Sequence, residues 1–188
     1  MSGLLSYLRR CAVGAAASCL LFTLSAAIAS AETRHALIVG NDSYLDLPPL
    51  LKARNDARAV DEALKQSGFS TNLVLDAGQT PFLEAFSSFA QTVNPGDVAL
   101  FYYAGHGIEI DGQNYLLPTD APDVNAGQEL VLTSRAVSVS SLLETLTRRG
   151  ARASIFILDA CRDNPFRAKT TRGLGGTRGL APVSADGT

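Results

Sequence analysis

Hydrophobic residues along the chain alternate between short unbroken runs and longer segments with helical spacing. The runs predict buried strands, and apolar positions three or four residues apart predict helices between them. Strands are expected at 34–39, 71–75, 98–104 and 153–158, and helices at 55–66, after Thr80-Pro81 and from Ser141 to Arg149. A further hairpin is expected at 108–117, across Asp111-Gly112, before a polar stretch that extends to about Val137. This order predicts an α/β fold with an open, mainly parallel sheet and helices on both faces.

Two of the helices have predicted N-caps. Thr80 precedes Pro81, which suits the first helical turn, and Ser141 with Glu144 fits a capping box.

Residues 1–31 are unlike the rest of the chain. Arg9 and Arg10 precede an uncharged stretch of apolar and small residues, and Ala29-Ser30-Ala31 fits a cleavage site. We therefore expect a signal peptide at 1–31 and a periplasmic or secreted protein. The alternative is an uncleaved anchor, with residues 11–31 in the inner membrane. The catalytic domain is expected at 32–166, and a flexible tail rich in Gly and Arg at 167–188.

Charge and cysteine content limit the classes of function that fit the chain. Without Arg9 and Arg10, 14 basic residues face 18 acidic ones, a net charge of −4, so no nucleic-acid partner is expected. Cys11 and Cys19 leave with the leader, and Cys161 remains without an internal disulfide partner.

The carboxyl ends of the third and fourth strands carry the candidate chemistry. His106 follows the third strand and Cys161 the fourth, and side chains meet at that edge of a parallel sheet. An imidazole beside a thiol makes a competent nucleophile, and the Gly107 and Cys161 amides could stabilise an oxyanion. The alternatives are a structural histidine and a buried, inert cysteine. Another thiol-dependent α/β hydrolase is disfavoured, because Cys161 lacks a nucleophile-elbow motif.

The blocks around these two residues carry a family resemblance. Tyr-Tyr-Ala-Gly-His-Gly at 102–107 and Asp-Ala-Cys-Arg-Asp-Asn-Pro-Phe at 159–166 resemble the caspase and metacaspase superfamily of cysteine peptidases, in its bacterial branch with a p20-type domain. The resemblance covers roughly residues 34–182. It implies a three-layer caspase-haemoglobinase-like sandwich and endopeptidase activity on protein or peptide substrates. Cys161 would be the nucleophile and His106 the general base and acid, with no redox or nucleotide cofactor.

Two carboxylates suggest the specificity of such an enzyme. Asp159 lies two residues before Cys161, so both face the same side of the strand. Asp56 matches a second acidic pocket residue of the resembled family, and together they would bind a basic P1 side chain. Arg54 could instead neutralise this pocket or favour acidic substrates. A strand-end carboxylate and a helix-start acid are the structural alternatives.

Some members of the resembled family bind calcium through acidic clusters. Asp111, Asp120, Asp123 and Asp163 lie in loops without regular ligand spacing, so no metal is expected in the catalytic step.

The end of the chain raises a second possibility for function. Relatives usually continue into two further strands, whereas this sheet is expected to stop after its fourth strand. The apolar run 154–158 resembles an interior strand, which leaves three alternatives. The sequence is a fragment of a longer protein whose missing part follows the tail, a partner chain completes the sheet, or the fold is a weakened half-domain. The alternative to an active peptidase is therefore a catalytically incompetent binding or scaffold module.

Overall fold

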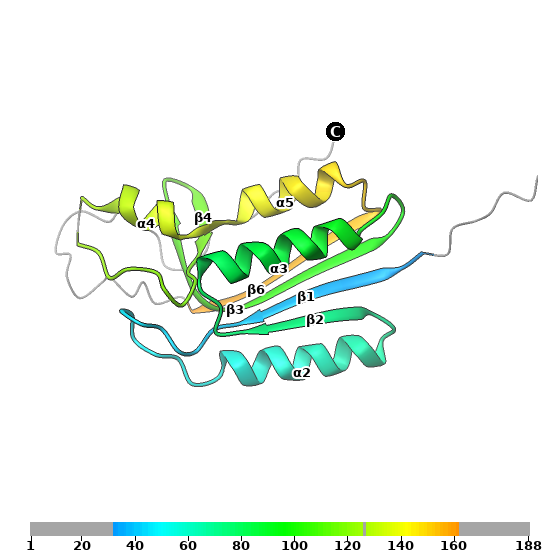
Figure 1. Cartoon of the computed structure of the whole chain (residues 1–188), viewed down its shortest axis with the longest axis horizontal. Coiled ribbons are helices and arrows are strands. Elements are labelled where there is room, and N and C mark those ends of the chain that lie inside the picture. Colours follow the sequence, from blue (N-terminus) through cyan, green and yellow to red (C-terminus); the bar gives the residue numbers. More distant parts are fainter. Residues whose placement is uncertain (1–31, 126, 162–188) are drawn as a thin grey trace, which may run out of the picture. The chain divides into compact units, whose positions relative to one another are not determined.

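The computed structural model describes residues 32–125 and 127–161. Strands and helices alternate as the hydrophobic pattern predicts (Figure 1). The strands are β1 (Arg34–Gly40), β2 (Ser70–Leu75), β3 (Val98–Ile110), β4 (Gln113–Leu116), β5 (Val137–Ser138) and β6 (Ala153–Cys161). The helices are α2 (Ala53–Gln66), α3 (Gln79–Thr92), α4 (Glu129–Arg135) and α5 (Val139–Arg148).

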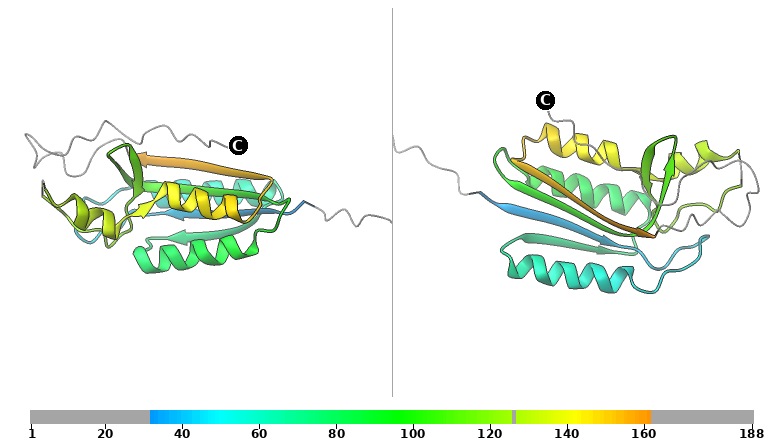
Figure 2. Two further views of the ribbon diagram at one scale, coloured as in Figure 1. Left: turned by 90° about the horizontal axis from the view of Figure 1, so that it is seen from above. Right: turned by 180° about the vertical axis from the view of Figure 1, so that it is seen from behind.

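Four of the strands form a parallel sheet in the order β2-β1-β3-β6. β3 is the central element, because it pairs with β1 on one side and with β6 along its whole parallel length on the other (Figure 2). The sheet remains open. This confirms the predicted α/β sandwich, and it places the carboxyl ends of β1, β2, β3 and β6 at one edge.

Helices cover both faces of the sheet (Figures 1 and 2). On one face α2 packs Ala53 and Ala57 against Ile38 and Leu100. On the other face α3 and α5 enclose a larger core, which contains Phe82, Phe86, Phe89, Leu142, Leu146, Leu37, Val39, Phe101 and Tyr103. Alternate residues of β1 therefore enter different cores, as the two-residue period of a strand requires.

The hairpin is formed by an extension of β3. Its last residues, Gly107 to Ile110, pair antiparallel with β4, and the turn lies at Asp111 and Gly112, both with positive φ. Two-residue turns of this kind favour Asp-Gly because both positions need a left-handed backbone. The predicted hairpin is thus confirmed, and β3 is longer than its apolar run.

Three local predictions differ from the structure. The polar stretch after the hairpin contains the short helix α4, which burial of Leu132 stabilises. Helix α3 begins at Gln79, with Gly78 as its N-cap, and the carboxylate of Asp120 accepts a hydrogen bond from the Gln79 amide at 2.7 Å. The predicted Thr80 cap is therefore wrong, because an acid distant in sequence takes over its role.

The predicted Ser141 cap is also wrong. α5 starts at Val139, and its N-cap is Ser138, whose hydroxyl accepts a hydrogen bond from the Ser141 amide at 3.3 Å. The helix begins earlier because Val139 is buried against the sheet.

The predicted leader at 1–31 and tail at 167–188 lie outside the described residues. Within the described part of the chain, no helix has the length and apolar character needed to cross a membrane.

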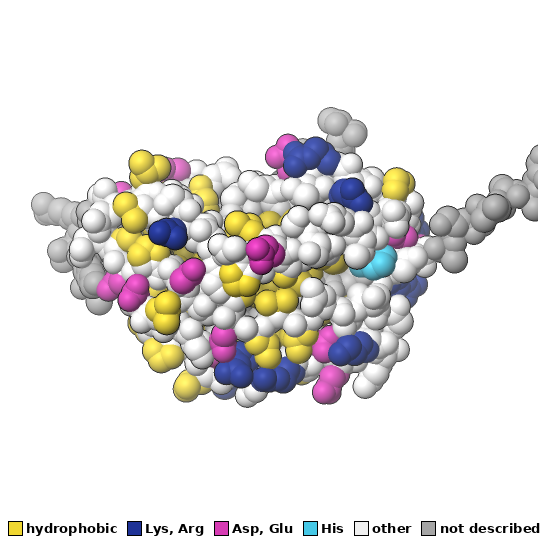
Figure 3. Space-filling model, viewed as in Figure 1, with side chains coloured by type: hydrophobic (Ala, Val, Ile, Leu, Met, Phe, Trp, Pro, Cys, Tyr) yellow, Lys and Arg dark blue, Asp and Glu magenta, His cyan; other side chains and the backbone are white. Residues whose placement is uncertain are grey.

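Hydrophobic side chains are also exposed at several places on the face seen in Figure 3, including the end of the sheet where α4 lies. The exposed large residues of that helix are Leu130 and Val131.

Candidate active site

His106 lies on β3 just beyond the part of the strand that pairs with β1. In the parallel register of β3 and β6, His106 is paired with Cys161, the last described residue of β6. Paired positions of adjacent strands lie about 4.8 Å apart. The two residues that the sequence singled out are thus neighbours in the sheet, 55 residues apart in the chain.

The imidazole of His106 is buried and held from one side. Its Nε2 lies 2.8 Å from the backbone oxygen of Pro48, in the loop that follows β1. A carbonyl oxygen only accepts hydrogen bonds, so Nε2 carries the proton and Nδ1 of the neutral ring is the acceptor. Among the described residues, no hydrogen-bond partner reaches Nδ1. The ring therefore presents a basic nitrogen that is free to take a proton.

Burial sets the proton affinity of this ring. Loss of solvent lowers the pKa of His106 below its ordinary value of 6.5, and the hydrogen bond with the Pro48 carbonyl opposes this effect without cancelling it. The neutral imidazole, which is the form a general base needs, therefore persists to a lower pH than in a free histidine.

Two tyrosines hold the backbone on which His106 lies. The Tyr44 hydroxyl accepts a hydrogen bond from the His106 amide at 2.8 Å, and its ring lies 4.5 Å from the imidazole centroid. The Tyr103 hydroxyl donates toward the carbonyls of His106 at 2.7 Å and Leu117 at 2.9 Å, and lies 3.3 Å from the Tyr44 hydroxyl. Gly105 admits both hydroxyls, because a Cβ there would approach them within 3 Å.

A pocket of about 470 Å³ opens beside this site. Asp56 from α2 and Asp159 from β6 both line it, together with Leu50, Leu51, Lys52 and the backbone at Ala104 and Gly105. Behind them the Tyr102 hydroxyl donates to Asp159 at 3.3 Å. Burial raises the pKa of Tyr102 to about 12, with further contributions from the negative charges of Asp159 and Asp56. The pocket is thus acidic on the side where the two carboxylates lie.

The structure answers one question that the sequence left open. The guanidinium of Arg54 forms an ion pair with Asp76 at 3.1 Å, and Arg54 is not among the residues that line the pocket. Its guanidinium is therefore paired with Asp76, and among the described residues no ion pair joins it to Asp56. Lys52, exposed at the N-cap of α2, is the basic residue that does line the pocket.

The remaining predicted site residues stand as follows. Gly107 lies in the antiparallel part of β3, opposite Leu116, and its role with the Cys161 amide as an oxyanion hole stays a prediction. The absence of a metal in catalysis is also untested. Among the described residues, no three potential metal ligands gather, and Asp163 lies outside them.

Sequence reasoning missed Pro48 and Tyr44 as partners of His106. They lie 58 and 62 residues before it, in a loop without helical or strand periodicity. The Gly40-Asn41-Asp42 turn that begins this loop is the only local indication that the chain turns back toward the sheet edge.

Comparison with known proteins identifies the family of the chain. The model of the caspase domain matches residues 33–185. The chain therefore belongs to the caspase domain family, a family of peptidases. A solved structure from Geobacter sulfurreducens shares the fold, with a TM-score of 0.53 and 17% identity over 68% of this chain and 50% of that one.

Two curated relatives show the same similarity at the level of sequence. The chain is 29% identical to the mucosa-associated lymphoid tissue lymphoma translocation protein 1 homolog of Mus musculus over 70% of its length. It is also 29% identical to the paracaspase of Dictyostelium discoideum over 81% of its length. It spans 15% and 37% of those proteins, respectively.

Proposed function

We propose that this protein is a cysteine endopeptidase in which His106 and Cys161 form the catalytic dyad. One observation carries the proposal: the sheet register pairs His106 with Cys161, while Pro48 holds Nε2 and leaves Nδ1 available as a base. Membership of the caspase domain family supports the reaction class.

The proposed reaction has two steps. The Cys161 thiol gives its proton to Nδ1 of His106, and the thiolate attacks the carbonyl carbon of the scissile peptide bond. The leaving amine takes the proton from His106, and an acyl-enzyme remains. Water then attacks the thioester with His106 as base, which releases the carboxylate product and regenerates the thiol. The Gly107 and Cys161 amides are proposed to stabilise the oxyanion in both steps.

We further propose cleavage after basic residues. Asp56 and Asp159 line one pocket beside His106, and two carboxylates attract a guanidinium or ammonium group. The ion pair between Arg54 and Asp76 supports this assignment, because the Arg54 guanidinium is then not available to pair with the carboxylates of the pocket.

The test is intact-mass labelling and peptide mapping of the full chain with an arginine chloromethyl ketone and its aspartate counterpart. The arginine probe is expected to label Cys161 in the folded chain, and the urea-unfolded chain, in which His106 no longer lies beside Cys161, serves as the unactivated control. Labelling is expected to be lost in Cys161→Ala and to fall about 100-fold or more in His106→Ala. Preference for the aspartate probe would contradict the basic pocket.

Matched variants separate the pocket from the dyad. Asp56→Asn and Asp159→Asn are expected to lower labelling by the arginine probe about tenfold each, through loss of one charge-assisted contact. Labelling by a small uncharged reagent such as iodoacetamide is expected to stay within twofold of the parent chain, because the dyad is intact. An equal loss with both reagents would assign the two aspartates to the structure instead.

One observation favours the second candidate, a caspase-like binding module without turnover. Ile155 and Ile157 on β6 are 40% and 44% exposed, and within the described residues β6 pairs only with β3. A partner chain that completes the sheet would cover them. Under this alternative neither chloromethyl ketone labels Cys161 faster in the folded chain than in the urea-unfolded chain.

We also propose export to the periplasm or beyond, on the sequence of residues 1–31. Fractionation of cells that express the full chain, with mass measurement of the product, tests this proposal. A product that begins at Met1 in the membrane fraction would indicate an anchor instead.

A further inference from the structure

The loop between β1 and α2, residues 41–52, holds His106 in place. It supplies the Pro48 carbonyl to Nε2 and the Tyr44 hydroxyl to the backbone amide of His106. The same loop contributes Leu50 and Leu51 to the wall of the acidic pocket. Both the ring and the pocket therefore depend on the path that this loop takes.

Burial alone does not fix that path. Leu45 and Leu51 of the loop are 79% and 86% exposed, so these large apolar side chains contribute little to holding it. Asn41, Tyr44 and Leu47 are its buried residues, and no residue of the loop after Leu47 is buried. The polar contacts at its two ends must supply much of the remaining restraint.

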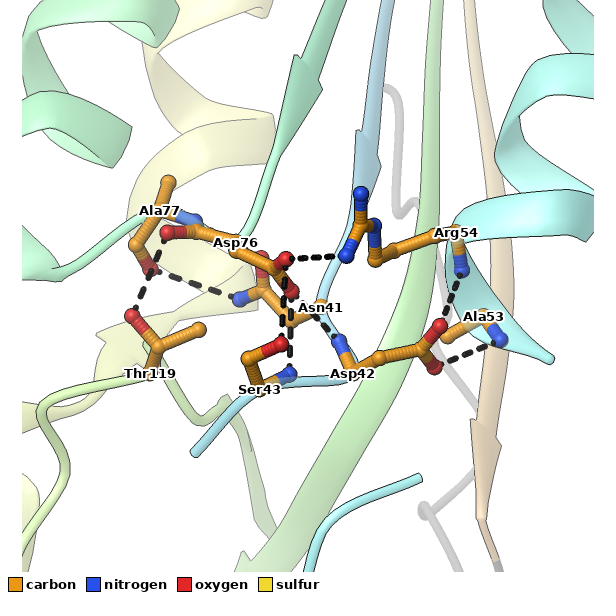
Figure 4. A network of polar contacts seen from close by, with 8 residues as sticks. All are labelled: Asn41, Asp42, Ser43, Ala53, Arg54, Asp76, Ala77 and Thr119. Atoms are coloured by element: carbon orange, nitrogen blue, oxygen red, sulfur yellow. Dashed lines mark hydrogen bonds and ion pairs between the residues drawn. The ribbon is translucent and has the colours of Figure 1, made fainter. Parts of the chain in front are cut away.

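Asp76 makes the contacts at the start of the loop (Figure 4). It lies directly after β2, and its Oδ1 accepts hydrogen bonds from the backbone amides of Asp42 at 2.8 Å and Ser43 at 3.0 Å. Its Oδ2 accepts from the Ser43 hydroxyl at 3.2 Å and pairs with Arg54 Nη1 at 3.1 Å. One carboxylate thus joins the end of β2, the start of the loop and the first turn of α2.

Asp42 makes the contacts at the other end. Its two side-chain oxygens accept hydrogen bonds from the backbone amides of Ala53 at 2.9 Å and Arg54 at 3.2 Å, at the start of α2. Its carbonyl accepts from the Leu50 amide at 2.9 Å. Figure 4 shows Arg54 between the two carboxylates, its backbone bonded to Asp42 and its guanidinium to Asp76. We call these three residues the Asp42-Arg54-Asp76 clasp.

We propose that Asp76 is a positioning residue of the active site, whose carboxylate fixes loop 41–52 so that Pro48 and Tyr44 meet His106. Its backbone supports the assignment, because Asp76 has a φ of +52°, a left-handed conformation that non-glycine residues seldom adopt. The strained backbone aims the carboxylate at the amides of Asp42 and Ser43. The role in catalysis rests on the proposed function, whereas the geometry at His106 can be tested without it.

The electrostatics of Asp76 agree with a clasp that is charged in the folded protein. Partial burial by itself raises the pKa of this carboxyl, but the amides of Ser43 and Asp42 and the charge of Arg54 together outweigh that effect and lower the pKa. The carboxylate therefore stays ionised, and accepts all its hydrogen bonds, at pH values below the usual pKa range of an aspartate.

The first test reads His106 directly. The chain has two histidines, His35 and His106, so ¹⁵N-detected imidazole spectra of the full chain contain signals from two rings. Asp76→Gly keeps the left-handed backbone and removes the carboxylate, whereas Asp76→Asn also keeps an oxygen that accepts from both amides. In Asp76→Gly the His106 ring gains solvent, so its pKa is expected to rise toward 6.5, and its Nε2 proton to exchange faster with water. Asp76→Asn is expected to retain most of the parent behaviour.

The environment of His106 determines how this shift is interpreted. The titratable groups placed against it in the described structure are the Tyr44 hydroxyl from the loop and the Tyr103 hydroxyl from β3, both neutral near pH 6.5. The remaining neighbour is the backbone position of Cys161 on β6. Repeating the measurement in Cys161→Ala excludes any effect of a charge on the Cys161 thiol.

Matched controls separate positioning from general loss of structure. Asp111→Gly changes the other aspartate with positive φ, at the exposed hairpin turn, and is expected to leave the His106 titration unchanged. The His35 ring, paired with Asp97 at 3.6 Å, reports whether the fold persists in each variant. If Asp76→Gly does not fold, Asp42→Ala opens the clasp from its other end at a residue without positive φ. A folded variant with an unchanged His106 pKa and unchanged exchange would overturn the proposal.

The second test concerns the reaction. Labelling of Cys161 by the arginine chloromethyl ketone is expected to fall about 100-fold in Asp76→Gly, as for a misplacement of about 1 Å in a catalytic group, and to recover in Asp76→Asn. If Cys161 of the parent chain is not labelled, the proposed peptidase activity is contradicted. The titration of His106 would still test the clasp. Full labelling in Asp76→Gly with a shifted His106 pKa would refute the catalytic part alone.

Discussion

Gly105 is the residue at which the smallest change should disturb the site most. It lies between Tyr103 and His106 on β3, and a Cβ at this position would lie 2.5 Å from the Tyr103 hydroxyl oxygen, 2.7 Å from its Cζ and 2.8 Å from the Tyr44 hydroxyl oxygen. Tyr103 is fully buried, so its ring has no free space into which to move. Gly105→Ala therefore forces the two hydroxyls that support His106 apart.

Two effects set the expected magnitude. Overpacking of a well-packed core by one methyl group costs about 1 to 3 kcal/mol. A displaced Tyr103 hydroxyl also weakens the hydrogen bond that its one proton shares between the carbonyls of His106 and Leu117, worth about 1 kcal/mol in total. We expect the free energy of unfolding to fall by about 2 to 4 kcal/mol, which corresponds to a decrease in Tm of about 5 to 15 °C for a domain of this size.

Urea unfolding and thermal melting of the full chain measure this loss, and labelling of Cys161 measures its effect on the site. In a Tyr103→Phe background the 2.5 Å contact is absent, so the further loss caused by Gly105→Ala is expected to be about 1 kcal/mol smaller. A Gly105→Ala protein with unchanged Tm and unchanged labelling would refute the reasoning, as would strictly additive losses in the double variant.

Three other perturbations test separate parts of the structure. Asp159→Asn is expected to lower the pKa of Tyr102 from about 12 while leaving it above 10, because burial is the larger cause of the shift. Titration of the tyrosine ¹³Cζ signals measures this pKa. An unchanged pKa would contradict the contact between Tyr102 and Asp159. Because the folded-state pKa of His106 lies below 6.5, the unfolded chain binds this proton first as the pH falls, so the free energy of unfolding should decrease below pH 6.5 until the folded pKa is reached. Urea unfolding between pH 5 and 7.5 should show a smaller decrease in His106→Gln than in the parent chain. Equal pH dependence of the free energy of unfolding in the two proteins would contradict the lowered pKa of His106. Phe82→Ala, in the centre of the α3 core, is expected to lose about 3 to 5 kcal/mol of stability, whereas Leu83→Ala on the exposed side should lose under about 1 kcal/mol, and similar losses would place the core elsewhere.

Only part of the candidate site could be predicted from the sequence. His106 and Cys161 follow apolar runs, and parallel strands bring such positions to a common edge, so their candidacy needed only the strand pattern and the resemblance of two short blocks. Their adjacency required the strand order, in which β6 lies beside β3 and pairs His106 with Cys161, 55 positions further along the chain. Asp159 was predicted from the two-residue period of the strand and Asp56 from the family resemblance, and the structure brings both to one pocket.

The contacts that tune these residues could not be read from local patterns. Pro48 and Tyr44 act through a backbone carbonyl and a hydroxyl in an irregular loop, for which neither periodicity nor composition predicts a partner. The doubt about Arg54 had the same origin, because its neighbour in sequence is Asp56 but its ion-pair partner is Asp76, at the end of a different strand. Helix starts were misjudged for a related reason, since Asp120 reaches the first turn of α3 from a distant loop.

The sequence by itself determined the alternation of strands and helices, the parallel sheet and the two short blocks that carry the candidate dyad, because hydrophobic period and turn residues act over a few positions. The tertiary structure decided which strand lies beside which, which carboxylate holds the Arg54 guanidinium, and how loop 41–52 reaches His106. These depend on contacts between residues far apart in the chain, where the packing of the sheet and the need to satisfy buried polar groups select one arrangement among many that the local pattern allows.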